Sequence, residues 1–460
     1  MVRFFRYSFM ALTTLVLMAC EQANGSFLNS LTSASIATVN ADESNGELKS
    51  VLELGAMIEG SRSSVNVDAG FERALLQALD QDPAVLAAKS EATVTRASLQ
   101  VTETGFDTQV KATLLGGVED VTDETAGVAA ILTANRLLYD GGMLDAKVDA
   151  DASLVKAADQ AYVTMRGKRA LNLAIAWIEL ERYQSLERLI NSRLEVLDPL
   201  LVQLERVASS GAGDVSQVAS AKRIVSSILV AKTSVSEKYQ QAKISFVNGF
   251  GRLPSSARYE ASWVSSRLPA SSSARKLAEN SPGLAAQYWA YRAAEASVLA
   301  IKAKDNFSIS LNAKLQQPFG GSEADSAESV GLVFTKEFYQ GNQLTSQVER
   351  AEAVAHSKAA KVFSTYRESE LAILAAREMV KSMEKAITLV RNNANSSREE
   401  TEYLRKQLII GGSTLESVLS AEARLYDAES KEIDFTAERL KAQATIIAIT
   451  GDFSEGLSPD

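Results

Sequence analysis

The chain has 460 residues and a formal net charge of −9, with 46% hydrophobic but only 7% aromatic residues. Lys and Arg form no cluster above this acidic background, so nucleic acid is excluded as an expected partner. The single cysteine, Cys20, and the single histidine, His356, exclude a thiol–imidazole pair and a metal site of clustered His and Cys. No constellation of residues indicates an enzyme, and we expect no cofactor.

The first residues have the pattern of a bacterial export signal. Two arginines precede an apolar stretch over 7–19, which is too short for a comfortable membrane span. The four residues that end at Cys20, LMAC, resemble the lipobox of bacterial lipoproteins, whose cysteine becomes lipidated. An ordinary secretory signal beside an unrelated cysteine is the alternative. We expect a lipoprotein signal peptide over 1–19 and a lipidated tether over 20–68, a stretch rich in Ser, Asn, Thr and Gly.

The remaining sequence repeats one large unit. The segment Tyr139-Asp140-Gly141-Gly142-Met143-Leu144 is echoed 200 residues later by Tyr339-Gln340-Gly341-Asn342-Gln343-Leu344. Solenoid repeats are much shorter, about 20–50 residues, so this period indicates a duplicated supersecondary unit. We place the units at 69–254 and 275–453, with a Ser/Ala-rich linker over 255–274 and a tail over 454–460.

Within each unit the pattern predicts a helix, two strands, a long helix, a turn and a further helix. Residues 307–315 alternate strictly between apolar and polar side chains, and 110–114 do so more weakly, as in a strand with one face of each kind. The return strands are expected over 128–138 and 329–339, each ending at the Tyr-x-Gly signal. Tyr139 and Tyr339 fit an interfacial aromatic belt or ordinary packing.

The long helices are predicted over 143–208 and 343–410. Leu344, Val348 and Ala351 begin a helical seam, and no proline interrupts 343–410. A helix of about 66 residues would be about 100 Å long, a length that suits the crossing of a wide compartment. The shorter helices, about 70–105, 214–248 and 413–449, would cover the long ones end to end.

Each long helix is predicted to end at a glycine-bearing turn, over 209–213 and at Gly411-Gly412. A capping-box pattern follows each turn, with Asp214 and Ser413 as the capping residues and with Gln217 and Glu416 three positions later. The chain therefore reverses into a second helix at both places.

Four amphipathic strands of about 10 residues are long enough to cross a bilayer when tilted. They are too few to close a membrane barrel, which needs about eight, and an open sheet edge in lipid costs several kcal/mol for each unpaired backbone group. The strands must therefore lie outside lipid or be completed by other copies, and three copies would supply twelve. The alternative to such a pore is a lipid-anchored periplasmic coiled-coil scaffold without channel activity.

On these repeats, on Leu137-Leu138-Tyr139-Asp140-Gly141-Gly142, and on the segments 411–421 and 425–428, the chain resembles the TolC family of outer-membrane channel proteins. The resemblance covers about 69–453. It implies a mainly α fold with a small β part, in a homotrimer whose 12-stranded β-barrel continues into an α-helical periplasmic barrel. It further implies the outer-membrane exit duct of a tripartite efflux or type I secretion system, served by a periplasmic adaptor and an inner-membrane pump or ABC exporter. The cargo stays open.

The resemblance also assigns candidate site residues. In the best-known member two aspartates of the last helix ring the periplasmic aperture; here Ser417 and Ser420 occupy the matching positions, and Gln217 the equivalent place in the first unit. We therefore expect a weaker, hydrogen-bonded constriction. The turn glycines are candidates for adaptor docking as well as for C-cap geometry, which favours glycine; they are Gly211, Gly213, Gly411 and Gly412.

Overall fold

The computed structural model describes residues 65–117, 127–210, 215–258, 267–269, 273–319, 326–338 and 341–453. All of them belong to one compact unit, Ser63–Asp460. The predicted signal peptide, Cys20 and the tail over 454–460 lie outside the described residues. Within the described ranges, no helix combines the length and apolar character that crossing a membrane requires.

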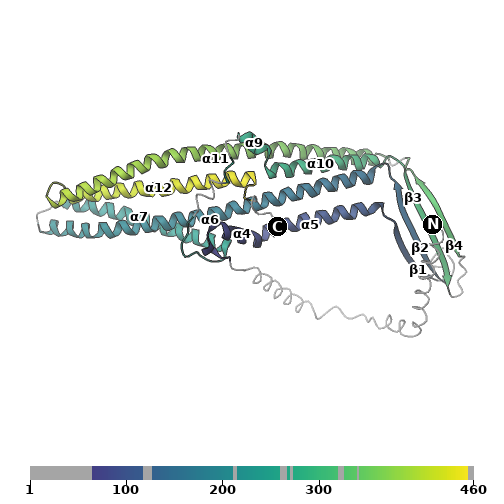
Figure 1. Cartoon of the computed structure of the whole chain (residues 1–460), viewed down its shortest axis with the longest axis horizontal. Helices are drawn as coiled ribbons and strands as arrows, with labels where there is room; N and C mark the ends of the chain where they lie inside the picture. Colours follow the sequence, from purple (N-terminus) through teal and green to yellow (C-terminus); the bar gives the residue numbers. More distant parts are fainter. Residues whose placement is uncertain are drawn as a thin grey trace, which may run out of the picture. The chain divides into compact units, whose positions relative to one another are not determined.

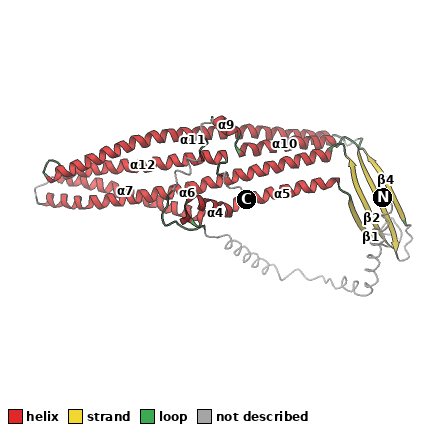
Figure 2. Cartoon of the chain, in the orientation of Figure 1, coloured by secondary structure: helices red, strands yellow, loops and turns green. Residues whose placement is uncertain are grey.

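The order of elements predicted for each unit is confirmed (Figures 1 and 2). The first unit contains η1 (Val67–Ala69), α4 (Phe71–Gln81), α5 (Pro83–Glu103), η2 (Thr104–Phe106), β1 (Gln109–Gly117), β2 (Gly127–Tyr139), α6 (Met143–Ser209) and α7 (Val215–Phe250). The second contains α9 (Ala274–Glu279), α10 (Pro282–Ala303), β3 (Ser308–Phe319), β4 (Ala327–Thr335), α11 (Gln343–Ile409) and α12 (Leu415–Thr450).

The two long helices, α6 and α11, have 67 residues each. A helix of this size is about 100 Å long. α6 packs against α5 and α7, and α11 packs against α10 and α12, so each long helix is covered by two shorter ones (Figure 1). α6 contains Pro199 and nevertheless continues to Ser209. Proline removes one backbone hydrogen bond, and burial of Leu197 and Leu204 on either side of it holds this part of the helix in place.

The helix predicted over 70–105 is wrong as a single element, because it divides at Asp82 into α4 and α5. The Oδ1 atom of Asp82 accepts hydrogen bonds from the backbone N–H groups of Ala84 at 2.9 Å and Val85 at 3.2 Å. Pro83 follows at the first helical position, where its missing N–H costs nothing. Arg169 of α6 binds the other carboxylate oxygen of Asp82 at 2.6 Å, which fixes this break against the long helix.

The four strands form one antiparallel sheet in the order β1-β2-β3-β4. The strands of the two units meet between β2 and β3, so the duplicated halves build a single sheet, with β1 and β4 at its edges. β2 ends at Tyr139 as predicted. The prediction that β4 extends to 339 is wrong, because β4 ends at Thr335; Tyr339 itself lies outside the described residues.

The largest buried cluster joins α4, α6 and α7. Trp177 of α6 is 1% exposed and lies against the rings of Phe71, Phe246 and Phe250, with centroid distances of 5.1–5.4 Å. Its Nε1–H donates to the backbone carbonyl of Arg258 at 3.1 Å. A residue of this size buried on all sides anchors the long helix to the start of the described chain.

Candidate functional site

The sheet has one apolar and one polar face. Partner residues in the register place the following side chains on one face: Val110, Ala112, Leu114, Ala130, Leu132, Ala134, Ile309, Leu311, Ala313, Leu315, Val330, Leu332 and Phe334. The other face carries mainly Gln, Asn, Ser, Thr and Lys. The alternation predicted for 110–114 and 307–315 is confirmed in β1 and in β3 over 308–315, whereas Ile131 of β2 and Val333 of β4 lie on the polar face.

The apolar face is exposed within the chain. Val110, Leu114, Val330, Leu332 and Phe334 are each 56–76% exposed, and all five belong to the edge strands β1 and β4. Water-soluble monomers rarely leave such a contiguous apolar surface uncovered. The exceptions on this face are Arg136, Gln317 and Glu328.

Gly141 forms the pivot between β2 and α6. It has φ +73°, and a Cβ atom on it would lie 2.2 Å from the Cβ of Asn306, so only glycine fits. Asn306 donates from Nδ2 to the carbonyl of Gly141 at 3.0 Å, and Asp140 accepts from the backbone N–H of Leu144 at 2.7 Å. The Tyr139-to-Leu144 segment therefore fixes the angle at which α6 leaves the sheet.

The turn between α11 and α12 has the C-cap geometry expected of its glycines. Gly411 has φ +77°, and its N–H donates to Leu408 at 3.2 Å while the N–H of Gly412 donates to Gln407 at 2.8 Å. These two bonds form a Schellman motif, which satisfies the last carbonyls of a helix. Gly211 and Gly213, the corresponding candidates of the first unit, lie outside the described residues.

The residue that caps α12 is Thr414, so the prediction of Ser413 is wrong. The Oγ1 atom of Thr414 accepts from the backbone N–H of Ser417 at 3.1 Å. Ser413 instead donates from its hydroxyl to the carbonyl of Leu404 in α11 at 2.8 Å. The Schellman turn takes up one more residue than the pattern indicated, which moves the cap by one position. Asp214 lies outside the described residues.

The aperture candidates all lie near the end of the bundle where the helices reverse. Ser417 and Ser420 are half-buried on the first turns of α12, and Gln217 is half-buried near the start of α7 (Figure 1). A buried cluster that includes Leu204, Leu415 and Leu419 joins α6, α7 and α12 at this end. The hydroxyls of Ser417 and Thr414 lie 2.8 Å apart, so Ser417 belongs to a local hydrogen-bond network at the start of α12.

Two residues after Ser420 on α12, Glu422 is completely buried. Its carboxylate binds Arg193 of α6 at 3.0 Å and also pairs with Arg405 of α11. Arg193 in turn binds Glu429, which pairs with Arg398 of α11 at 2.9 Å. This ladder of five charged side chains connects three helices around a carboxylate that has no access to water.

Sequence reasoning missed this ladder, although a signal for it exists. Arg398 and Arg405 are seven residues apart on α11, as are Glu422 and Glu429 on α12. The pairs are symmetric about the turn near 413–414, so a helical hairpin with heptad packing brings each arginine opposite one glutamate. Arg193 belongs to the other unit, and its place in the ladder depends on how the two units pack. No spacing within either unit indicates this contact.

A second charged cluster joins α6 to α12 further from the turns. Arg182 binds Asp434 at 2.8 Å and Glu438 at 3.2 Å, and Lys441 binds Glu179 and Glu438 at 2.7 Å each. Burial lowers the pKa of Lys441, but its hydrogen bonds to the two glutamates outweigh burial and raise the pKa above the ordinary 10.5. The stabilisation from this lysine is therefore complete below pH 10.5 and is lost as the pH rises through the higher folded-state value.

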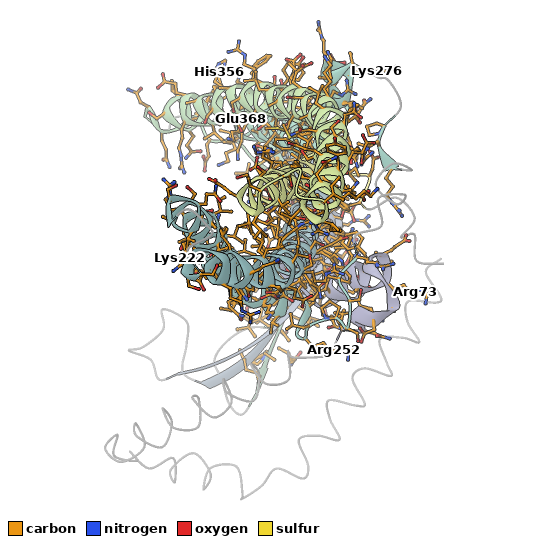
Figure 3. The ribbon with its side chains drawn as sticks, turned by 90° about the vertical axis from the view of Figure 1, so that its left-hand side faces the viewer. Arg73, Lys222, Arg252, Lys276, His356 and Glu368 are labelled. Carbon is orange, nitrogen blue, oxygen red and sulfur yellow. The ribbon has the colours of Figure 1, made fainter. Side chains whose placement is uncertain are left out.

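His356 lies on α11 at the margin of the helical part in the end-on view (Figure 3). It is exposed. Among the described residues, no group of three or more His, Cys, Asp or Glu side chains has the arrangement that a metal ion needs.

Comparison with known proteins identifies this architecture. Residues 274–452 match the family model of outer membrane efflux proteins. No curated protein sequence matches the chain. The fold is similar to that of CusC, in a structure concerned with transmembrane channel formation, with a TM-score of 0.72 and 16% identity over 84% of this chain and 93% of CusC.

Two further solved structures share the fold. A membrane protein from Pseudomonas aeruginosa has a TM-score of 0.70 and 17% identity over 87% of this chain and 94% of its own. The outer membrane protein VceC from Vibrio cholerae has a TM-score of 0.68 and 18% identity over 82% and 95%, respectively. The chain thus has the fold of these solved outer-membrane proteins, as its sequence pattern predicted, and its residues 274–452 match the model of the outer membrane efflux protein family.

Proposed function

We propose that three copies of this chain form a passive outer-membrane exit channel of a tripartite efflux system. The observation that carries the proposal is the sheet: one face is apolar and exposed, the other is polar, and both edge strands lack a partner strand within the described chain. Strands of 9–13 residues are long enough to cross a bilayer. Pairing of β4 with β1 of the next copy removes every open edge and closes a 12-stranded barrel.

The long helices support the same assembly. α11 carries large apolar side chains that are 45–70% exposed: Val354, Phe363, Leu371, Leu374, Met379 and Leu389. The helices of the neighbouring copies would cover this surface and continue the barrel as a tube into the periplasm. Cys20 would carry the lipid anchor, and the α11–α12 turn with Gly411 and Gly412 would meet a periplasmic adaptor, which links the channel to an inner-membrane pump. Proteins of this family are transporters without enzymatic activity.

Export without the lipid anchor tests this proposal against the scaffold alternative. The protein would be exported from an ordinary secretory signal with Cys20→Ser, and outer membranes would be extracted and reconstituted in planar bilayers. A channel stays in the membrane fraction, needs detergent for extraction and gives discrete conductance steps. A scaffold is released into the periplasm and gives no conductance, which would overturn the proposal.

The aperture candidates give a separate prediction. We propose that Ser417, Ser420 and Gln217 narrow the periplasmic end through hydrogen bonds rather than charge. Ser417→Asp with Ser420→Asp would place six carboxylates in a trimer at this level, and we expect single-channel current to become sensitive to multivalent cations. Ser417→Ala with Ser420→Ala is expected to raise conductance and antibiotic leakage.

Ser430→Ala is the matched control, because it removes a serine hydroxyl from the same helix, where that hydroxyl donates to the backbone carbonyl of Asp427 at 3.0 Å and touches neither candidate serine. If neither pair of substitutions changes current or leakage relative to this control, the constriction lies elsewhere.

A further inference from the structure

The polar face of the sheet carries two cations in a single cross-strand row. Lys111 of β1 and Lys314 of β3 both lie opposite Thr133 of β2, and Ser329 of β4 completes the row. Neighbouring strands are about 4.8 Å apart, so the backbones of the two lysines are about 10 Å apart. Both side chains are exposed.

No carboxylate on this face opposes the two lysines. The described strand residues on the polar face include Gln109, Thr113, Asn135, Ser308, Ser310, Asn312, Gln316 and Thr335, and none of them is Asp or Glu. The acidic Glu328 lies on the opposite face, beside Leu315. The positive charge of the row is therefore not neutralised within the described sheet, although the chain as a whole is acidic with a net charge of −9.

The position of the lysine row along the strands also indicates the surroundings of the two ammonium groups. Along β3, Lys314 lies between Ala313 and Leu315, whose side chains are on the apolar face in the rows that also contain Ala134 and Leu132. A lysine at the level of an apolar band is costly unless its side chain faces water. In an outer-membrane barrel such water is inside the lumen.

We infer, on the basis of the proposed trimeric channel, that Lys111 and Lys314 of three copies form a ring of six ammonium groups on the lumen wall, and that this ring attracts and binds anions. Fixed charges of one sign inside a low-dielectric wall focus the field and raise the local concentration of counter-ions by about 10–10³-fold. The ring would therefore favour anionic cargo over cationic cargo at the membrane level of the conduit, and it would bind a multivalent anion more tightly than a monovalent one.

Single-channel recording with inorganic tripolyphosphate as the probe tests this inference. We expect tripolyphosphate to block the wild-type current, and Lys111→Gln with Lys314→Gln to raise the half-blocking concentration at least about tenfold. The reversal potential in a KCl gradient should shift toward cation selectivity in the same variant. Lys111→Arg with Lys314→Arg, which keeps both charges, should behave as wild type. Lys276→Gln is the matched control, because this exposed lysine lies on α9, far along the bundle from the sheet (Figure 1).

The outcomes separate the two proposals. Discrete conductance with no tripolyphosphate block, or a block and reversal potential that the glutamine variant leaves unchanged, would overturn the lysine ring and leave the channel intact. Absence of conductance from correctly inserted wild-type protein would overturn the channel itself and the ring with it.

Discussion

Replacing both Arg193 and Arg405 by methionine is expected to destabilise the chain by about 3–5 kcal/mol. Glu422 is fully buried, and these two arginines are its cationic partners in the structure. Without them its carboxylate stays in a region that water does not reach, and a buried charge that loses its partners costs about that much. The measurement is urea unfolding of the purified protein, followed by the helical circular dichroism signal.

A third substitution distinguishes loss of charge pairing from loss of arginine packing. Adding Glu422→Leu to the double variant removes the unpaired charge and should restore most of the lost stability, because apolar replacements of buried ion networks are often neutral or stabilising. The matched control is Arg275→Met with Arg292→Met, since each of these arginines belongs to an exposed pair within one helix. Exposed pairs contribute about 0–1 kcal/mol. If the variant of Arg193 and Arg405 is as stable as this control, the ladder does not hold the three helices together.

The second large effect is expected at Trp177. Trp177→Ala removes the centre of the ring cluster formed with Phe71, Phe246 and Phe250 and leaves a cavity between α4, α6 and α7. Truncation of a buried aromatic residue costs about 3–5 kcal/mol. We expect α4 to separate from α6 first, because α4 has only 11 residues and its first residue, Phe71, packs directly on Trp177, and the release would appear as early proteolytic cleavage near residues 71–81.

Trp289→Ala is the matched control for this prediction. Trp289 is half-buried and has Lys156 Nζ 4.2 Å from its ring centroid. Loss of such an exposed cation–π contact costs about 0.5–1 kcal/mol. Equal losses of stability in the two variants would contradict the assignment of Trp177 as the anchor of α4.

Much of the fold follows from local pattern. The starts of α6 at Met143 and of α11 at Gln343 coincide with the predicted positions, because a repeated glycine turn and a change of period mark them. The errors also have local causes. The break at Asp82 and the cap at Thr414 depend on which polar side chain reaches the free backbone N–H groups. A sequence pattern does not distinguish between two neighbouring residues that could both cap a helix.

The site was less accessible to sequence reasoning. The positions of Ser417 and Ser420 came from the resemblance, and the structure adds that Ser417 is part of the α12 cap. The role of Arg193 depends on contacts between units about 230 residues apart, which no periodicity encodes. The alignment of Lys111 with Lys314 requires the register of β1 on β2 and of β2 on β3, which is set by strand pairing across both units.

The mass of the detergent-extracted protein tests the central claim most directly, because the described part of one chain supplies four of the twelve strands in the proposed barrel. Mass photometry of protein purified from outer membranes should give particles of three chains that dissociate only on heating. A stable, fully inserted particle of one chain would contradict the account.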